Sequence, residues 1–157
     1  MRIYLVRHGD AVPEDDAGSD RDRWLSPHGR EAARVLGRLL REQAVAPDAI
    51  LASPLPRAVQ TAELLATSLD YLGTVISLRC LEPAAQPRVA GSAILSAGAS
   101  VLVVSHEPAI SALGAHLLGI PAFPQFRTAQ CCAIENGKPT FTARADLGKI
   151  LTLFVDG

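Results

Sequence analysis

Short apolar runs alternate along the chain with stretches in which apolar residues recur every three or four positions. A run of aliphatic and β-branched residues is typical of a buried strand, and the longer periodicity is typical of an amphipathic helix. The runs predict strands at residues 2–6, 49–52, 74–78 and 100–104. The predicted helices run from the Ser26-Pro27 cap to about residues 45–47, from Ser53-Pro54 to Leu69, from 87 to 97 and from 108 to 118. The polar residues 12–22 between the first strand and the first helix are expected to form a solvated loop.

The last quarter of the chain predicts a β-hairpin. Residues 131–135 and 140–144 flank Asn136-Gly137, and Asn-Gly between two apolar segments is a strong signal for a tight turn. Repeated strand-helix units imply a mainly parallel sheet that is covered by helices on both faces. We therefore expect one α/β domain over residues 1–157, a three-layer sandwich whose mainly parallel central sheet has an antiparallel C-terminal edge.

Composition and charge narrow the class of protein. The 157 residues are 48% hydrophobic with a formal net charge of -1, which fits a folded globular domain and favours no nucleic-acid partner. No apolar run approaches the roughly 18 residues of a membrane span, and we expect no targeting signal before the first strand. The three cysteines lack the spacing of a zinc site or a disulfide framework. We expect a cytoplasmic protein with reduced cysteines and no membrane partner.

Histidine and arginine residues follow the predicted strands directly. The pair Arg7-His8 ends the first strand, and His106 follows the strand at 100–104. Arg57 lies near the start of the helix that comes after the strand at 49–52. Ligands bind beyond the carboxyl ends of parallel strands, where helix N-termini favour anions and arginine offers planar donors to phosphate oxygens. These residues predict a phosphate-binding pocket.

The same residues lie in three sequence blocks that resemble the histidine phosphatase superfamily, which includes the phosphoglycerate mutases and many phosphatases. The blocks are Arg7-His8-Gly9, Ser53-Pro54-Leu55-Pro56-Arg57-Ala58-Val59-Gln60-Thr61-Ala62 and Val104-Ser105-His106. Within the superfamily, the short chain is most similar to the SixA-type protein-phosphohistidine phosphatases. The segments that carry this similarity are Arg7-His8-Gly9-Asp10-Ala11 and Leu25-Ser26-Pro27-His28-Gly29.

The resemblance implies a phosphatase that needs neither a metal nor another cofactor. His8 would be the nucleophile and would carry the phosphoryl group as a covalent phosphohistidine. Arg7, Arg57 and His106 would bind the phosphoryl oxygens and stabilise the charge of the transition state, with a proton retained on His106. The expected partner is either a protein that carries phosphohistidine or, alternatively, a small-molecule phosphate ester.

Larger members of the superfamily use a carboxylate as general acid, and Glu82 is the positional candidate here. Glu107 and Asp10 are further candidates because they lie next to motif residues. A phosphohistidine substrate has an imidazole leaving group, which needs less protonation than an alkoxide, so the lack of a clear acid favours this substrate. The span from Arg57 to His106 holds no long insertion, which predicts an open, shallow pocket. A pocket roofed by residues 15–24 would count against this prediction.

Three other functions stay open at this point. One is an enzyme of the same superfamily that acts on small phosphate esters or as a mutase, and another is a non-catalytic phosphate-binding regulatory module. A metal-dependent hydrolase built from the four histidines is disfavoured, because the motifs pair histidine with arginine rather than with carboxylate ligands. The remaining polar residues near the motifs are interpreted as structural: Ser53 as a helix cap, Gln60 and Thr61 as supports of Arg57, and His28 and His116 as surface or packing residues.

Overall fold

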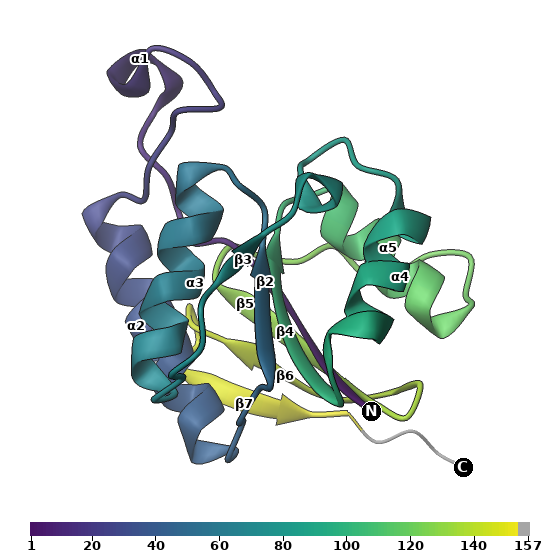
Figure 1. Ribbon diagram of the computed structural model, residues 1–157. Helices are drawn as coiled ribbons and strands as arrows, with labels where there is room; N and C mark the ends of the chain where they lie inside the picture. The colour runs from purple at the N-terminus through teal and green to yellow at the C-terminus, as the bar shows by residue number, and fades with distance from the viewer. Residues whose placement is uncertain (154–157) are drawn as a thin grey trace.

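Seven strands form one mixed sheet at the centre of the computed structural model, which describes residues 1–153 (Figure 1). The strands are β1 (Arg2–Arg7), β2 (Ala49–Ala52), β3 (Ile76–Ser77), β4 (Ser100–Ser105), β5 (Gln130–Glu135), β6 (Lys138–Arg144) and β7 (Lys149–Thr152). Their order across the sheet is β3-β2-β4-β1-β5-β6-β7. The first four strands are mutually parallel, and β5, β6 and β7 add an antiparallel edge beside β1.

Helices cover both faces of this sheet (Figure 1). One face carries α2 (Pro27–Glu42) and α3 (Pro56–Ser68), and the other carries α4 (Pro87–Ala97) and α5 (Ala109–Leu118). A one-turn helix, α1 (Glu14–Ala17), and a 3-10 turn, η1 (Arg79–Leu81), complete the list of helical segments in residues 1–153. The structure confirms the three-layer α/β fold. No helix in this part of the chain combines the length and the apolar character needed to cross a membrane.

Alternating side chains of β1 build the two cores. Tyr4 and Val6 pack with α2 and α3, whereas Ile3 and Leu5 pack with α4 and α5. Successive side chains of a strand point to opposite faces, so a continuous apolar run supplies both layers. This explains why the central strands have no polar alternation in the sequence.

The sequence pattern located most elements correctly. The helix at 87–97 and the Asn136-Gly137 hairpin are confirmed, and positive φ values at both turn residues fit the turn type that Asn-Gly favours. The loop prediction for 12–22 was incomplete, because Glu14–Ala17 forms the short α1. The third strand is shorter than predicted, and β7 was missed because its four residues are half-exposed at a sheet edge and lack a clear alternation.

The first long helix, α2, begins as its sequence indicates. The Ser26 hydroxyl accepts a hydrogen bond from the Gly29 amide at 3.0 Å, and Pro27 occupies the first turn. Such a cap stabilises a helix by about 1 kcal/mol. The helix ends at Glu42, earlier than predicted, because Ala44 adopts a left-handed conformation (φ 56°) that ends the helical hydrogen bonding.

Candidate active site

The carboxyl ends of β1, β2 and β4 meet at one edge of the sheet, as parallel pairing requires. Backbone hydrogen bonds extend the pairing one step past the strands: the His8 amide donates to Ser105 at 3.1 Å, and the Ser53 amide donates to Val104 at 3.0 Å. The loops that carry the predicted site residues therefore begin from a rigid edge. This brings His8 and His106 together from positions that are 98 residues apart (106 minus 8).

The two histidine rings lie beside each other in the buried part of the site. Their centroids are 4.9 Å apart and the ring planes are tilted by 59°. Nδ1 of His8 lies 2.6 Å from the carbonyl oxygen of Gly9. Because a carbonyl oxygen only accepts, Nδ1 carries the proton of the neutral ring, and Nε2 has a free lone pair.

Burial lowers the pKa of His8 to about 4, and the charges of Arg57 and Arg7 add to this effect. The hydrogen bond to Gly9 opposes the shift but does not cancel it. His8 is therefore a neutral imidazole at physiological pH. Its Nε2 is available to attack an electrophile without the prior loss of a proton.

We predict that His8 stays neutral well below the ordinary histidine range. Protonation requires the pH to fall to about 4, since the neutral form is favoured at every pH above this pKa. An NMR titration of the imidazole nitrogens measures this directly. A midpoint near the ordinary histidine value of about 6.5 would contradict the prediction.

His106 is also neutral when no anion is bound, and the extra proton expected on it during catalysis stays a prediction. Burial lowers the pKa of His106 to about 3, and the positive charge of His8, once His8 is protonated in acid, and that of Arg57 act in the same direction. Its Nε2 lies 2.7 Å from the Ser53 hydroxyl, and its buried Nδ1 has no hydrogen-bond partner within residues 1–153. Ser53 is thus a support for His106 rather than a helix cap. The N-cap residue of α3 is Leu55, without a side-chain cap.

Arginine side chains surround the histidine pair. Arg7 donates from Nη1 to the Phe126 carbonyl at 2.8 Å, which fixes its guanidinium. The Nε atoms of Arg7 and Arg57 are buried and have no partner in the part of the chain that the structure describes. Buried donors without partners cost free energy, and a bound anion would satisfy them.

Four of the five predicted site residues line one cavity of about 320 Å³, and Glu82 does not. The lining residues are Arg7, His8, Asp10, Ala11, Asp20, Arg23, Arg57, Pro83, His106, Glu107 and Thr128. The Glu82 carboxylate instead pairs with Arg21 at 3.0 Å, and this hydrogen bond lowers the pKa of Glu82. Its role as a general acid therefore stays a prediction that this geometry does not favour.

The other candidate acids are held by nearby donors. Glu107 accepts from the backbone amides of Ser111 at 3.0 Å and Phe126 at 2.9 Å, one on each oxygen. Asp10 accepts from the Ser26 hydroxyl at 2.7 Å. Both carboxylates are thus engaged in hydrogen bonds that hold the loops around the cavity.

Sequence reasoning missed two charged residues of the cavity, Arg23 and Asp20. Arg23 is anchored by Nε, which donates to the Val12 carbonyl at 2.7 Å. Both lie in the polar segment 12–23, where no periodicity distinguishes one charged residue from another. Only the fold shows that this segment supplies one wall of the cavity through Asp20 and Arg23. The predicted open pocket is therefore bounded on one side by part of the segment 15–24.

Polar residues of α3 hold the loop after β1 in place. The Thr61 hydroxyl accepts from the Gly9 amide at 3.0 Å and donates to the Arg57 carbonyl at 2.8 Å. Gln60 accepts from the Leu25 amide at 2.8 Å. Thr61 therefore links the His8 loop to the helix that carries Arg57, which refines the supporting role expected for it.

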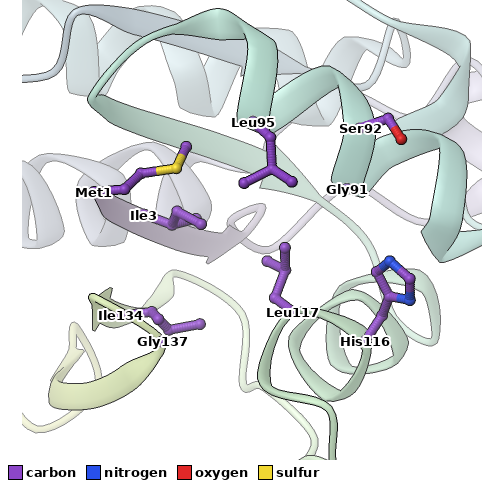
Figure 2. Close-up of a pocket in the computed structure, with 9 residues that line it drawn as sticks. All are labelled: Met1, Ile3, Gly91, Ser92, Leu95, His116, Leu117, Ile134 and Gly137. Carbon is purple, nitrogen blue, oxygen red and sulfur yellow. The ribbon is translucent and has the colours of Figure 1, made fainter.

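A second cavity lies away from this site, beside the first residues of β1 (Figure 2). It is mainly apolar, with Ile3, Leu95 and Leu117 projecting into it and His116 at its edge. None of the predicted site residues lines it. Within residues 1–153, no three His, Cys, Asp or Glu side chains form a group that could hold a metal ion.

Comparison with known proteins agrees with this site. Residues 3–82 match the family model of the histidine phosphatase superfamily (branch 1). Phosphohistidine phosphatase SixA of Escherichia coli (strain K12) is 33% identical over 148 residues, which cover 90% of this chain and 91% of the relative. A solved structure of the protein histidine phosphatase SixA complexed with tungstate superposes with a TM-score of 0.79 at 28% identity, covering 98% of this chain and 95% of that one.

A more distant relative matches only part of the chain. The serine/threonine-protein phosphatase Pgam5 of Drosophila persimilis is 34% identical over 74 residues, which are 47% of this chain and 25% of that protein. The similarity to SixA, by contrast, extends over nearly the whole length of both proteins. The chain therefore belongs to the histidine phosphatase superfamily and is a hydrolase of the SixA-like type.

Proposed function

We propose that His8 is the nucleophile of a two-step phosphoryl transfer. In the first step Nε2 forms a bond to phosphorus while the bond to the leaving group breaks, and the leaving group takes up a proton from solvent. In the second step water attacks phosphorus, the bond between Nε2 and phosphorus breaks, inorganic phosphate leaves and His8 returns to its neutral form. The observation that carries this proposal is the 2.6 Å contact between Nδ1 and the Gly9 carbonyl, because it directs the lone pair to Nε2.

The cationic residues around His8 would bind the phosphoryl oxygens. Arg7, Arg57 and the newly located Arg23 bring three charges that do not titrate near neutral pH. Fixed positive groups of this kind stabilise the charge that spreads over the equatorial oxygens in the transition state. In the known SixA complex the ligand is tungstate, another tetrahedral oxyanion, which supports an oxyanion site in this fold.

His106 would contribute as a hydrogen-bond donor. If the Ser53 hydroxyl donates to Nε2, the proton of the neutral ring lies on Nδ1, where it can donate to a phosphoryl oxygen. A bound dianion also favours the protonated ring, since a nearby negative charge raises a histidine pKa. His106 would therefore gain positive character only with substrate bound.

The substrate that this site fits best is a phosphohistidine side chain of another protein. The E. coli relative is a phosphohistidine phosphatase, and its similarity covers nearly the whole chain. The carboxylates Asp10 and Glu107 are held by other donors, and Glu82 lies outside the cavity. A leaving group that needs little protonation suits a site without a free acid.

Two proposals concern the chain as a whole. Residues 1–157 would form a single domain, since one sheet runs from β1 at the start of the chain to β7 near its end. The protein would act in the cytoplasm. It would need no metal, because the arginines supply the charge that a metal ion provides in many phosphatases.

The proposed function predicts phosphate release with a clear substrate preference. Wild-type protein should hydrolyse a phosphohistidine-bearing protein faster than a generic aryl phosphate ester, and a chelator should leave both rates unchanged. Glu82→Gln should slow phosphohistidine hydrolysis by less than about twofold, since the Glu82 carboxylate pairs with Arg21 outside the cavity. Loss of activity with chelator would overturn metal independence. A preference for the ester, or a large loss in Glu82→Gln, would overturn the substrate assignment.

A further inference from the structure

A carboxylate of the protein itself contacts the arginines of the active site. The Asp20 carbonyl oxygen accepts from Nη1 of Arg57 at 2.7 Å, and Oδ2 of Asp20 lies 3.3 Å from Nη2. The other carboxylate oxygen, Oδ1, accepts from Nη1 of Arg23 at 3.2 Å. Asp20 thus contacts two guanidinium groups with both of its carboxylate oxygens.

These two arginines are among the three that the proposed function assigns to the phosphoryl oxygens, so the inference rests on that function. Only 5% of the Arg57 side chain is exposed, whereas 54% of the Asp20 side chain is exposed. The arginine is therefore fixed in the wall of the cavity, and the carboxylate reaches it from the solvent side. Because Arg57 is buried and Asp20 is not, only the Asp20 carboxylate can move away into solvent. Another anion can then take its place at Arg57.

The segment that carries Asp20 is attached weakly. Its ends are joined by the bridge between Ala11 and Leu25 and by the hydrogen bond from the Val12 amide to Trp24 at 2.8 Å. Between these points, none of the residues 13–22 is buried, and the loop with α1 projects from the body of the protein (Figure 1). Among the described residues, the hydrogen bonds of residues 13–22 to the rest of the chain are those of Asp20 with Arg57 and Arg23 and of Arg21 with Glu82.

We propose that Asp20 is a built-in competitor of the phosphoryl group: its carboxylate must leave Arg57 and Arg23 before an oxyanion binds them. Two anions at the same pair of guanidinium groups repel each other, so the site cannot hold both at full strength. The loop has no buried side chain to hold it, and its release disturbs no core packing. Asp20 therefore weakens phosphate binding and speeds release of the product.

The charge state of Asp20 agrees with this role. The hydrogen bond from Arg23 and the charge of Arg57 hold the pKa of Asp20 below its usual value. Its carboxylate is then ionised at neutral pH, as a competitor for arginine must be. An ionised group has no proton to give, so the same environment argues against Asp20 as the general acid.

A positioning role makes the opposite prediction. If Asp20 served to orient Arg57, removal of its charge would loosen the guanidinium and weaken phosphate binding. If Asp20 competes with phosphate, removal of its charge strengthens binding. The direction of the change in phosphate affinity therefore separates the two roles.

The test is the dissociation constant of inorganic phosphate, measured by isothermal titration calorimetry on wild type and on Asp20→Asn. We expect Asp20→Asn to bind phosphate about fivefold more tightly, as expected when a partly exposed ion pair no longer has to be broken. Asp22→Asn is the matched control, because it removes the same charge from the same loop, but within residues 1–153 Asp22 forms its hydrogen bonds with Ser19 and not with an arginine of the cavity. It should change the affinity by less than about twofold at physiological salt.

The inference is overturned if Asp20→Asn binds phosphate with unchanged or weaker affinity. It is also overturned if both variants bind phosphate more tightly by the same factor, or if none of the three proteins binds phosphate. Calorimetry needs no turnover, so these outcomes are distinct from a failure of the proposed function. That failure would appear as hydrolysis that does not depend on His8. Because Asp20 is largely exposed, its variant should unfold at the wild-type temperature, which checks that the fold is intact.

Discussion

Replacement of His8 by alanine should lower kcat for phosphate release by at least about 10³-fold, the loss typical when a nucleophile is removed. Nε2 of His8 would make the only covalent bond to phosphorus in the proposed reaction, and no other side chain in the cavity offers a neutral imidazole with a free lone pair directed by a backbone carbonyl. Phosphate should still bind, because the arginines remain. The rate is measured with an aryl phosphate ester under saturating conditions.

Two further measurements make this prediction specific to His8. His28→Ala is the matched control: His28 is exposed at the start of α2, lies outside the cavity and should leave kcat unchanged. Rapid quenching of the wild type during turnover should trap an acid-labile phosphoryl group on the protein, as expected for a phosphohistidine, and His8→Ala should trap none. A His8→Ala enzyme that keeps more than about a tenth of the wild-type rate would show that another group attacks phosphorus.

The largest expected effect on stability comes from Gly29→Ala. A Cβ at position 29 would lie 1.9 Å from the Asp10 carbonyl oxygen, far inside van der Waals contact. Both atoms belong to backbone segments that are held by hydrogen bonds, since the Ser26 amide donates to the same Asp10 oxygen at 3.0 Å. Helix α2 and the loop after β1 must separate, and we expect a loss of about 2–3 kcal/mol in the free energy of unfolding.

Denaturant unfolding measures this loss, and Gly91→Ala serves as the control. Gly91 is also helical, but its Cβ would meet the exposed His116 ring at 3.0 Å, and a side chain can move aside. We expect Gly91→Ala to stay within about 1 kcal/mol of wild type, because alanine has the better helix propensity. Gly29→Ala should also lower the hydrolysis rate, since Asp10 adjoins the His8 loop. A stable and active Gly29→Ala protein would mean that the close approach of α2 is not needed.

The close approach at Gly29 explains how a short protein positions a rigid nucleophile. The loop from Arg7 to Asp10 is held from three sides: by the sheet through Ser105, by α2 at Gly29 and by α3 through Thr61. Each contact is to the backbone of the loop, so the side chain of His8 is left free to face the cavity. Rigid support of this kind keeps the reacting atoms in position without a large domain.

The sequence by itself determined the fold class and the core of the site. Arg7, His8 and His106 follow apolar runs that are typical of buried strands, and Arg57 follows a Ser-Pro turn at the start of a helix. The meeting of these residues is a consequence of parallel pairing, which places the carboxyl ends of β1, β2 and β4 at one edge. Local pattern and topology were sufficient here because each residue is defined by its distance from a strand end.

Only the tertiary structure decided the remaining features of the site. Asp20 and Arg23 lie in a polar loop without periodicity, and their contacts with the cavity depend on where the fold places that loop. Glu82 is close to the motifs in the sequence but turns to Arg21 outside the cavity. The neutral state of His106 arises because segments distant in sequence bury it and bring His8 and Arg57 beside it. Burial and charge at a site are sums over such distant segments, so no single stretch of sequence contains them.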